Sequence, residues 1–352
     1  MRLPGLNLTR LGEDQMTDKR RAFGRYFDNP DDLFNWLNQA VFGTAVMNAL
    51  NRAGVTARIL EGPVSVAELA DAGDIPADLL GRMIDFLAAH EMLELDADGL
   101  VRGSSRTAMM LEASGFLTNV EISGRACAQL LPALREGKTP FEKAYGEPVF
   151  DYFHSHPDMA AGFGQFMGFM TRRVQRFIFS QHRFQPFETV ADIGGSMGDM
   201  LLAILGEYPG TRGIVFDRPD VIEIARPKVE ASPLAERVEL VGGSFFEAVP
   251  AADLYILKQI LHDWDDEECR RILGSIRAAM KPGARLAVID HLLSDIPQPD
   301  ESIGTDIAMM VWDTGRERKQ SDFEALFTSA GFRIDRVTPN PNGHSVIEVV
   351  PV

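Results

Sequence analysis

A glycine-rich turn between an apolar strand and a helix is the feature that most constrains this chain. Residues 190–199 read VADIGGSMGD, and the apolar residues 200–202 follow as the start of a helical pattern. A dinucleotide site needs the spacing G-x-G-x-x-G, in which backbone amides approach a pyrophosphate at a helix N-terminus. Ser196 breaks that spacing. The turn therefore predicts a site for a nucleotide-type cofactor other than a dinucleotide.

Carboxylates stand on both sides of this turn. Asp192 lies just before Gly194 and Gly195, and Asp217 closes the next strand, residues 213–217. S-adenosylmethionine suits such a site, because it has no phosphate, carries a sulfonium and an ammonium group, and offers two ribose hydroxyls to a strand-end acid. The alternative is an ordinary turn with acids at solvated strand ends.

The composition argues against several classes of function. A formal net charge of -16 opposes binding to nucleic acid or anionic lipid, because both depend on Lys and Arg contacts. No window approaches a membrane-spanning length, and Met1–Arg25 has no signal-peptide core. Cys127 and Cys269 lie in no metal or redox motif, and we expect both to be buried thiols. These features predict a cytoplasmic protein with no nucleic-acid or membrane partner.

Helical patterns dominate the N-terminal part. Apolar residues recur at helical spacing over 33–53, and two short helices follow, the first with capping-box spacing at 65–68. Two short β-like runs then occupy 92–95 and 100–101. Helix, turn, helix and a small hairpin predict a winged-helix-like unit over residues 1–106.

A winged helix raises the alternative of a transcription regulator, whose recognition face would need positive charge. Between Ser65 and Gly99 there are nine acidic residues and one basic residue, Arg82. Binding to DNA through this face would be repelled. We therefore assign the unit to dimerisation and substrate enclosure, and expect a homodimer formed through it.

The rest of the chain divides into a helical segment and an α/β domain. Residues 107–184 are rich in Met and Phe, and the stripe over 159–174 is either a core helix or the wall of a pocket for a flat aromatic ligand. Over residues 185–352 strands and helices alternate, which predicts a parallel Rossmann-like sheet. The last two runs, 332–337 and 345–350, predict a terminal antiparallel hairpin.

Two ionisable side chains follow strands on the edge of the sheet where the glycine turn is expected, and a third lies in a polar loop. His262 follows one strand, Asp290 ends the next, and Glu317 precedes a helix at 323–330. Ligands of doubly wound sheets bind beyond the carboxyl ends of the strands, so these groups can converge. A neutral imidazole can remove a proton from a hydroxyl that attacks a sulfonium methyl group, and a carboxylate on its other nitrogen fixes the tautomer. This chemistry needs no metal.

Five segments resemble, in order and spacing, the small-molecule O-methyltransferases typified by caffeic acid and acetylserotonin O-methyltransferases. They are DIGGSMG (192–198), FDRPDVI (216–222), GGSFFE (242–247), LKQILHDWDDEEC (257–269) and GRERKQSDFEALFTSAGF (315–332). The resemblance spans nearly the whole chain and extends to bacterial members that modify polyketides or phenazines. It implies methyl transfer from S-adenosylmethionine to a hydroxyl of an aromatic, polycyclic secondary metabolite. A relative that hydroxylates or decarboxylates instead is the alternative.

The resemblance also implies roles for individual residues. The catalytic set is His262 as general base with Asp290 and Glu317 beside it. The cofactor-binding set consists of Asp192, Gly194, Gly195, Asp217, Arg218, Ser244, Phe245 and Lys258. The small aromatic substrate is expected to contact Phe163, Met167, Met309 and Trp312. Ser196 and Ser244 depart from the glycine and the acid usual in the family, which affects the expected position of the adenine.

Overall fold

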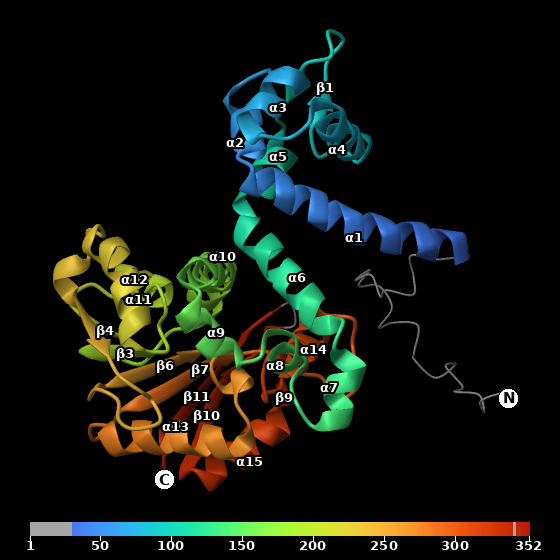
Figure 1. Cartoon of the computed structure of the whole chain (residues 1–352). Coiled ribbons are helices and arrows are strands. Elements are labelled where there is room, and N and C mark those ends of the chain that lie inside the picture. The colour runs from blue at the N-terminus through green and yellow to red at the C-terminus, as the bar shows by residue number, and fades with distance from the viewer. Residues whose placement is uncertain (1–29, 341–342) are drawn as a thin grey trace, which may run out of the picture.

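The computed structural model describes residues 30–340 and 343–352. The segment Met1–Arg25, in which we expect no signal peptide, lies outside the described residues. A helical part built from the N-terminal elements stands above an α/β part, and the helix α6 (Ser114–Cys127) runs from one to the other (Figure 1). In the described part of the chain, no helix has the length and apolar character needed to cross a bilayer.

The N-terminal part packs short helices around a core of its own. Its elements are α1 (Pro30–Arg52), α2 (Val55–Glu61), α3 (Val66–Gly73), α4 (Ala77–Ala89), β1 (Glu94–Leu95), β2 (Val101–Arg102) and α5 (Ser105–Glu112). The predicted capping box is confirmed, since Ser65 Oγ accepts from the Glu68 amide and the Glu68 carboxylate accepts from the Ser65 amide. Strands β1 and β2 pair antiparallel. Met110 and Leu117, beyond residue 106, belong to the same core.

The middle of the chain is helical, as predicted. After α6 come α7 (Leu130–Glu136), α8 (Pro140–Tyr145), α9 (Val149–Ser155) and α10 (Pro157–Gln181). Our expectation for Cys127 is wrong, because this residue ends α6 on its exposed side, whereas Cys269 is buried. Helical spacing alone did not show which side of α6 would be covered.

A mostly parallel sheet forms the centre of the α/β part, as predicted. Its order is β10-β11-β7-β6-β3-β4-β5, in which β11 runs antiparallel to both β10 and β7 and the remaining pairs are parallel. The strands are β3 (Thr189–Ile193), β4 (Arg212–Asp217), β5 (Val238–Gly242), β6 (Leu254–Lys258), β7 (Arg285–Asp290), β10 (Phe332–Thr338) and β11 (Ser345–Pro351). A separate parallel pair joins β8 (Leu292–Leu293) to β9 (Arg318–Lys319).

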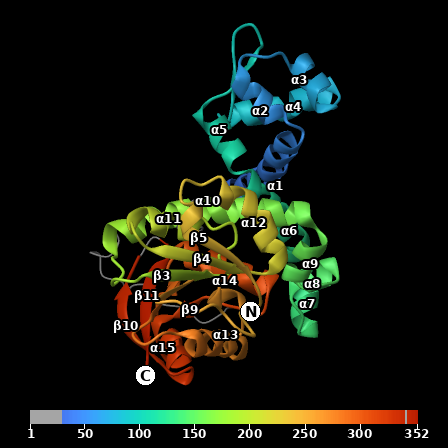
Figure 2. The same cartoon turned by 90° about the vertical axis from the view of Figure 1, so that its left-hand side faces the viewer.

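Helices cover both faces of this sheet (Figure 1, Figure 2). One face carries α10, α11 (Asp199–Glu207) and α12 (Pro219–Glu230), and the other carries α13 (Asp266–Ala279) and α15 (Gln320–Ser329). The helix α14 (Glu301–Trp312) packs on α6 and α8. Side chains alternate along the buried strands: Leu254 and Ile256 of β6 pack toward α10 and α11, and Tyr255 and Leu257 pack toward α13 and α15.

The strand register brings the predicted site residues to one edge. Asp192 of β3 pairs with Ile256 of β6, and Lys258 of β6 pairs with Ile289 of β7. Because these strands are parallel, their carboxyl ends face the same crevice. The segments after β3, β4, β6 and β7 therefore converge there.

Candidate active site

The glycine turn is held in a conformation that side chains would obstruct. Gly194 has φ of 71°, and a Cβ built on it would lie 2.3 Å from Ile260 Cδ1. A Cβ on Gly195 would lie 2.9 Å from the carbonyl oxygen of Asp192. The amides of Gly194 and Gly195 both donate to the carbonyl of Phe216, at 2.8 and 3.2 Å. The turn is therefore fixed against the end of β4 by its backbone.

Ser196, which departs from the family pattern, is compatible with this turn. Its φ is 48°, in the left-handed region that costs a non-glycine residue roughly 1 kcal/mol or more. Its amide donates to Asp217 Oδ2 at 2.8 Å, and this bond offsets part of that cost. Asp217 Oδ1 accepts from the amide of Arg218 at 2.8 Å. The carboxylate of Asp217 is thus oriented by two backbone amides.

Two carboxylates lie at this end of the crevice, Asp192 buried and Asp217 half-buried, and no cation of the described residues is bonded to either. Burial raises the pKa of Asp192 to about 7, although Lys258 opposes the shift, and its Oδ2 has no hydrogen-bond partner. Burial likewise raises the pKa of Asp217 to about 6 against its two amide bonds. The orphaned oxygen of Asp192 beside a glycine cradle, with the carboxylate of Asp217 nearby, fits a ligand that brings positive charge and hydroxyl donors. S-adenosylmethionine carries both.

Lys258 is the last residue of β6, and Gln259 follows it in the chain. Lys258 Nζ donates to Gln259 Oε1 at 2.8 Å, and burial lowers the pKa of the amine while Asp192 and Asp290 oppose that shift. Gln259 has φ of 54°, a strained backbone conformation of the kind that gathers at functional sites. The sequence analysis missed Gln259, although it lies inside the segment that carries Lys258 and His262.

His262 is buried in a short 3-10 turn, Leu261–Asp263, that follows β6. Its Nδ1 lies 2.8 Å from Glu317 Oε1, and its Nε2 lies 3.4 Å from Asp263 Oδ1. Burial lowers the pKa of His262, but the carboxylates of Glu317 and Asp263 raise it by more, to about 10. Burial also raises the pKa of Asp263 to about 6. The ring therefore donates from Nδ1 to Glu317, and Asp263 is a second neighbour that the sequence analysis left out.

The two acids expected beside His262 have different positions. Glu317 is bonded to the ring, and its own amide donates to Asp306 Oδ1 at 3.0 Å, which anchors the loop that carries it. Asp290 is fully buried, and neither of its carboxylate oxygens has a hydrogen-bond partner among residues 30–340 and 343–352. Burial raises the pKa of Asp290 to about 7. Its charge acts on His262 without a direct bond.

The remaining predicted cofactor residues lie around the same edge. Arg218 Nη1 donates to the carbonyl of Phe150 at 2.9 Å, so it joins β4 to α9. Phe245 stands beside the glycine turn, where a Cβ on Gly194 would lie 3.9 Å from its Cε1. Ser244 Oγ accepts from the amide of Phe246 at 3.3 Å.

The predicted substrate residues come from α10 and α14. Phe163 and Trp312 pack together with ring centroids 5.9 Å apart, and Trp312 Nε1 donates to Ser123 Oγ at 2.8 Å. Met167 and Met309 are half-buried. The structure thus gives Phe163 and Trp312 a packing role in an aromatic cluster at the junction of α6, α10 and α14.

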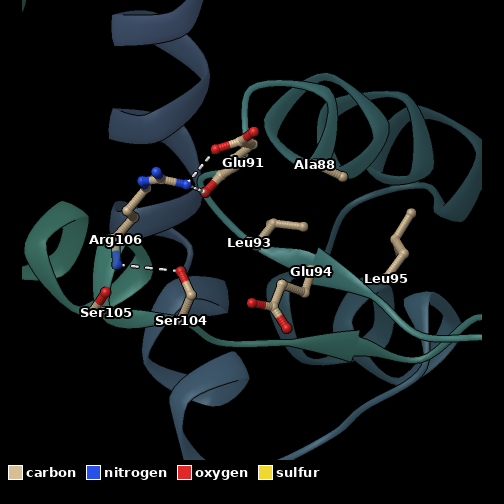
Figure 3. Close-up of a pocket in the computed structure, with 8 residues that line it drawn as sticks. All are labelled: Ala88, Glu91, Leu93, Glu94, Leu95, Ser104, Ser105 and Arg106. Carbon is tan, nitrogen blue, oxygen red and sulfur yellow. Dashed lines mark hydrogen bonds and ion pairs between the residues drawn. The ribbon is translucent and has the colours of Figure 1, made fainter.

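A hollow of about 710 Å³ lies elsewhere, in the N-terminal part (Figure 3). Its lining includes Glu91 and Arg106, which form an ion pair at 2.6 Å. It contains none of the predicted site residues. The crevice at the sheet edge remains the candidate active site.

Comparisons with known proteins identify the family of the chain. A model of the O-methyltransferase domain matches residues 128–333. The chain is 31% identical to "Phenazine O-methyltransferase PhzM" of Lysobacter antibioticus, covering 90% of this chain and 93% of the relative. It is 32% identical to "Mitomycin biosynthesis 6-O-methyltransferase" of Streptomyces lavendulae, covering 88% and 91%. The crystal structure of human N-acetylserotonin methyltransferase with S-adenosylmethionine matches with a TM-score of 0.81 at 25% identity, covering 92% and 98%. The chain therefore belongs to the family of S-adenosylmethionine-dependent O-methyltransferases.

Proposed function

We propose that this protein transfers a methyl group from S-adenosylmethionine to a hydroxyl of an aromatic secondary metabolite, with His262 as the general base. The observation that carries the proposal is the 2.8 Å contact between His262 Nδ1 and Glu317 Oε1, at the same sheet edge as the glycine turn. Relatives named for phenazine and mitomycin support a polycyclic acceptor. We expect no metal to take part.

The cofactor end of the crevice suits a cation. The proposed contacts are made by the glycine turn, the strand-end acids and the residues around them: Asp192, Gly194, Gly195, Asp217, Arg218, Ser244, Phe245 and Lys258. When bound, the sulfonium supplies a methyl group that is already activated toward attack. Asp192 and Asp217 offset positive charge and accept hydrogen bonds, while the backbone of the turn leaves room for close approach.

Proton removal falls to His262. Glu317 accepts the Nδ1 proton, which leaves Nε2 as the nitrogen that takes the proton of the acceptor hydroxyl. A ring held between carboxylates is protonated at neutral pH, so the base must first lose that proton. Positive charge brought into the crevice lowers the pKa of His262, because like charges disfavour the imidazolium. Such a base typically contributes about 10² to 10⁴ in rate.

The finer domain assignments are also proposals. We divide the chain into a winged-helix-like dimerisation domain (1–106), a helical pocket segment (107–184) that carries Phe163 and Met167, and a methyltransferase domain (185–352). Helix α1 supports a homodimer, because its Phe34, Val41 and Phe42 are each more than half exposed. Size-exclusion chromatography with light scattering tests this, with Phe42→Glu expected to yield monomer.

Location and partners complete the proposal. Both cysteines are free thiols, as is usual in a reducing cytoplasm. The strong negative charge supports the expectation of no nucleic-acid or membrane partner. Membership of an enzyme family sets aside the non-enzymatic regulator.

Product analysis tests the reaction. The protein is incubated with S-adenosylmethionine and hydroxylated phenazines, naphthoates and benzoates, and the products are identified by mass spectrometry. A methylated oxygen together with S-adenosylhomocysteine supports the proposal. An oxygenated or decarboxylated product supports the alternative relative. Loss of activity with EDTA that added metal restores would contradict metal independence.

A further inference from the structure

Arg318 is a buried cation directly beneath the turn that carries His262. Its side chain is 1% exposed. Nη1 donates to the carbonyl of Leu261 at 2.6 Å, and Nη2 donates to the carbonyl of Trp264 at 2.9 Å. Nε and Nη2 also donate to Asp266 Oδ1, at 3.1 and 2.7 Å. One guanidinium therefore holds the backbone on both sides of His262.

The segment Gly315–Arg318 contacts this turn at three places. A Cβ on Gly315 would lie 1.9 Å from the carbonyl oxygen of His262, so the two backbones touch. Glu317 bonds the ring of His262, and Arg318 bonds the carbonyls of the flanking residues. Ring and backbone of the histidine are thus oriented by neighbouring residues of one segment.

We infer that Arg318 is a positioning residue for the general base, because it fixes the turn 261–264 so that the imidazole of His262 meets the carboxylate of Glu317. The inference rests on the proposed role of His262. Arg318 touches neither reactant, and it acts through the backbone of the histidine. Among the described residues, the carbonyls of Leu261 and Trp264 accept, besides Arg318, only the weak thiol donor of Cys269, so they otherwise have little support.

Lysine cannot replace this arrangement. The guanidinium is a planar fork that reaches two carbonyls and one carboxylate at once, whereas an ammonium is a compact point charge. Arg318→Lys therefore keeps the charge next to Asp266 but releases at least one carbonyl. A shift of about 1 Å in a catalytic group can cost about 10²-fold in rate.

Arg316 provides a matched control. It pairs with the other oxygen of the same carboxylate, Asp266 Oδ2, at 3.0 Å, but it is half exposed and bonds no carbonyl of the turn. We expect Arg318→Lys to lower kcat about 10-fold to 100-fold, with KM for the acceptor and the affinity for S-adenosylhomocysteine changed less than about threefold. Arg316→Lys should change none of these by more than about twofold.

Two further measurements separate positioning from folding and from the role of the base. In protein labelled with ¹⁵N-histidine, the His262 Nδ1 proton bonded to Glu317 should give a downfield resonance that is absent in His262→Ala. It should move upfield in Arg318→Lys and stay in place in Arg316→Lys. In a double-mutant cycle, Arg318→Lys should add less than about twofold to the loss caused by His262→Ala.

Several outcomes would overturn the inference. They are an unchanged resonance and kcat in Arg318→Lys, a loss of cofactor affinity as large as the loss of kcat, or full additivity in the cycle. If His262→Ala keeps its turnover, the proposed function with His262 as general base fails instead. The His262 Nδ1 proton resonance in Arg318→Lys then still decides whether Arg318 positions the ring. Should Arg318→Lys not fold, Asp266→Asn tests the same inference, because it weakens the support of the guanidinium from outside the turn and should shift the same resonance.

Discussion

The two ends of the crevice are built in different ways. The proposed cofactor end consists of residues at the ends of β3 and β4: Asp192, Gly194, Gly195, Ser196 and Asp217. The proposed base end consists of residues from three separate segments: His262, Asp263, Asp290, Glu317 and Arg318. Backbone amides and local turn geometry fix the cofactor end, whereas side-chain contacts such as that between residues 262 and 317 fix the base end. Substitutions at the cofactor end should therefore change the affinity for the cofactor, and substitutions at the base end should change kcat.

The largest effect is expected from His262→Ala, which tests the base end alone. Turnover should fall by about 10² to 10⁴, the usual contribution of a general base. Affinity for S-adenosylhomocysteine, measured by calorimetry, should stay within about threefold, because its proposed contacts lie at the other end. His90→Ala, which removes an exposed imidazole in the N-terminal part, is the control. A matching loss of affinity would show that the two ends are not separable.

The second largest effect is expected from Glu317→Gln, whose loss of kcat is to be compared with that of Asp290→Asn. Glu317 bonds the ring, so the amide should lower kcat by about 10²-fold, through loss of the charge that stabilises the imidazolium. Asp290 has no bond to the ring, and its substitution should cost at least about fivefold less than that. Steady-state kinetics with a saturating acceptor measures both. Equal losses would mean that the two acids share the role symmetrically.

The effect of Gly194→Ala should be smaller than that of Glu317→Gln, and it should be a loss of cofactor affinity. The left-handed backbone costs alanine roughly 1–2 kcal/mol, and the new Cβ meets Ile260, so affinity for the cofactor should fall about 10-fold or more. Turnover at saturating cofactor should change less. Gly206→Ala in α11 is the matched control, since a Cβ there meets nothing within 4 Å. A loss confined to turnover would contradict the division between the ends.

The sequence allowed the geometry of the proposed cofactor end to be predicted more fully than the geometry of the proposed base end. Residues 192–198 are contiguous in the sequence. Gly194 has a positive φ, and because glycine adopts this conformation readily, the glycine in the sequence already indicates such a turn. The parallel sheet was predicted from the alternation of strands and helices, which is also a pattern along the sequence. The strand-end rule also brought His262 and Asp290 to one edge. These features depend on neighbours in sequence or on a general rule of topology.

Long-range packing decided what the sequence could not show. In the sequence, nothing distinguishes Asp290 from Glu317 as the acid that contacts His262. The packing of the loop after α14 brings Glu317 to the imidazole ring. Arg318 looks like a surface cation in sequence, yet the turn carbonyls draw it into the core. The prediction for Cys127 failed in the opposite sense, because the thiol was expected to be buried and is exposed. For Glu317 and Arg318 the deciding contact is with a residue more than 50 positions away in the chain.

The smallest expected effect is a difference in the pH range over which each end changes stability. Asp192 holds its proton more tightly when folded, with a pKa of about 7 against an ordinary 3.8. Its contribution to stability is therefore complete below about pH 4 and is lost as the pH rises through 7. His262, raised from 6.5 to about 10, contributes fully below pH 6.5 and loses that contribution as the pH rises through 10.

Thermal unfolding of the cofactor-free protein between pH 4 and 10 separates the two ranges. Asp192→Asn should flatten the fall in Tm between about pH 4 and 7, and Glu317→Gln should flatten it between about pH 6.5 and 10, since Glu317 is the main cause of the raised pKa of His262. The pH range over which Tm responds distinguishes the two variants, and 1 kcal/mol shifts Tm by roughly 2–4 °C in a domain of about 150–250 residues. If both variants flatten the same range, the titrations are coupled across the crevice, and the ends cannot be treated as independent.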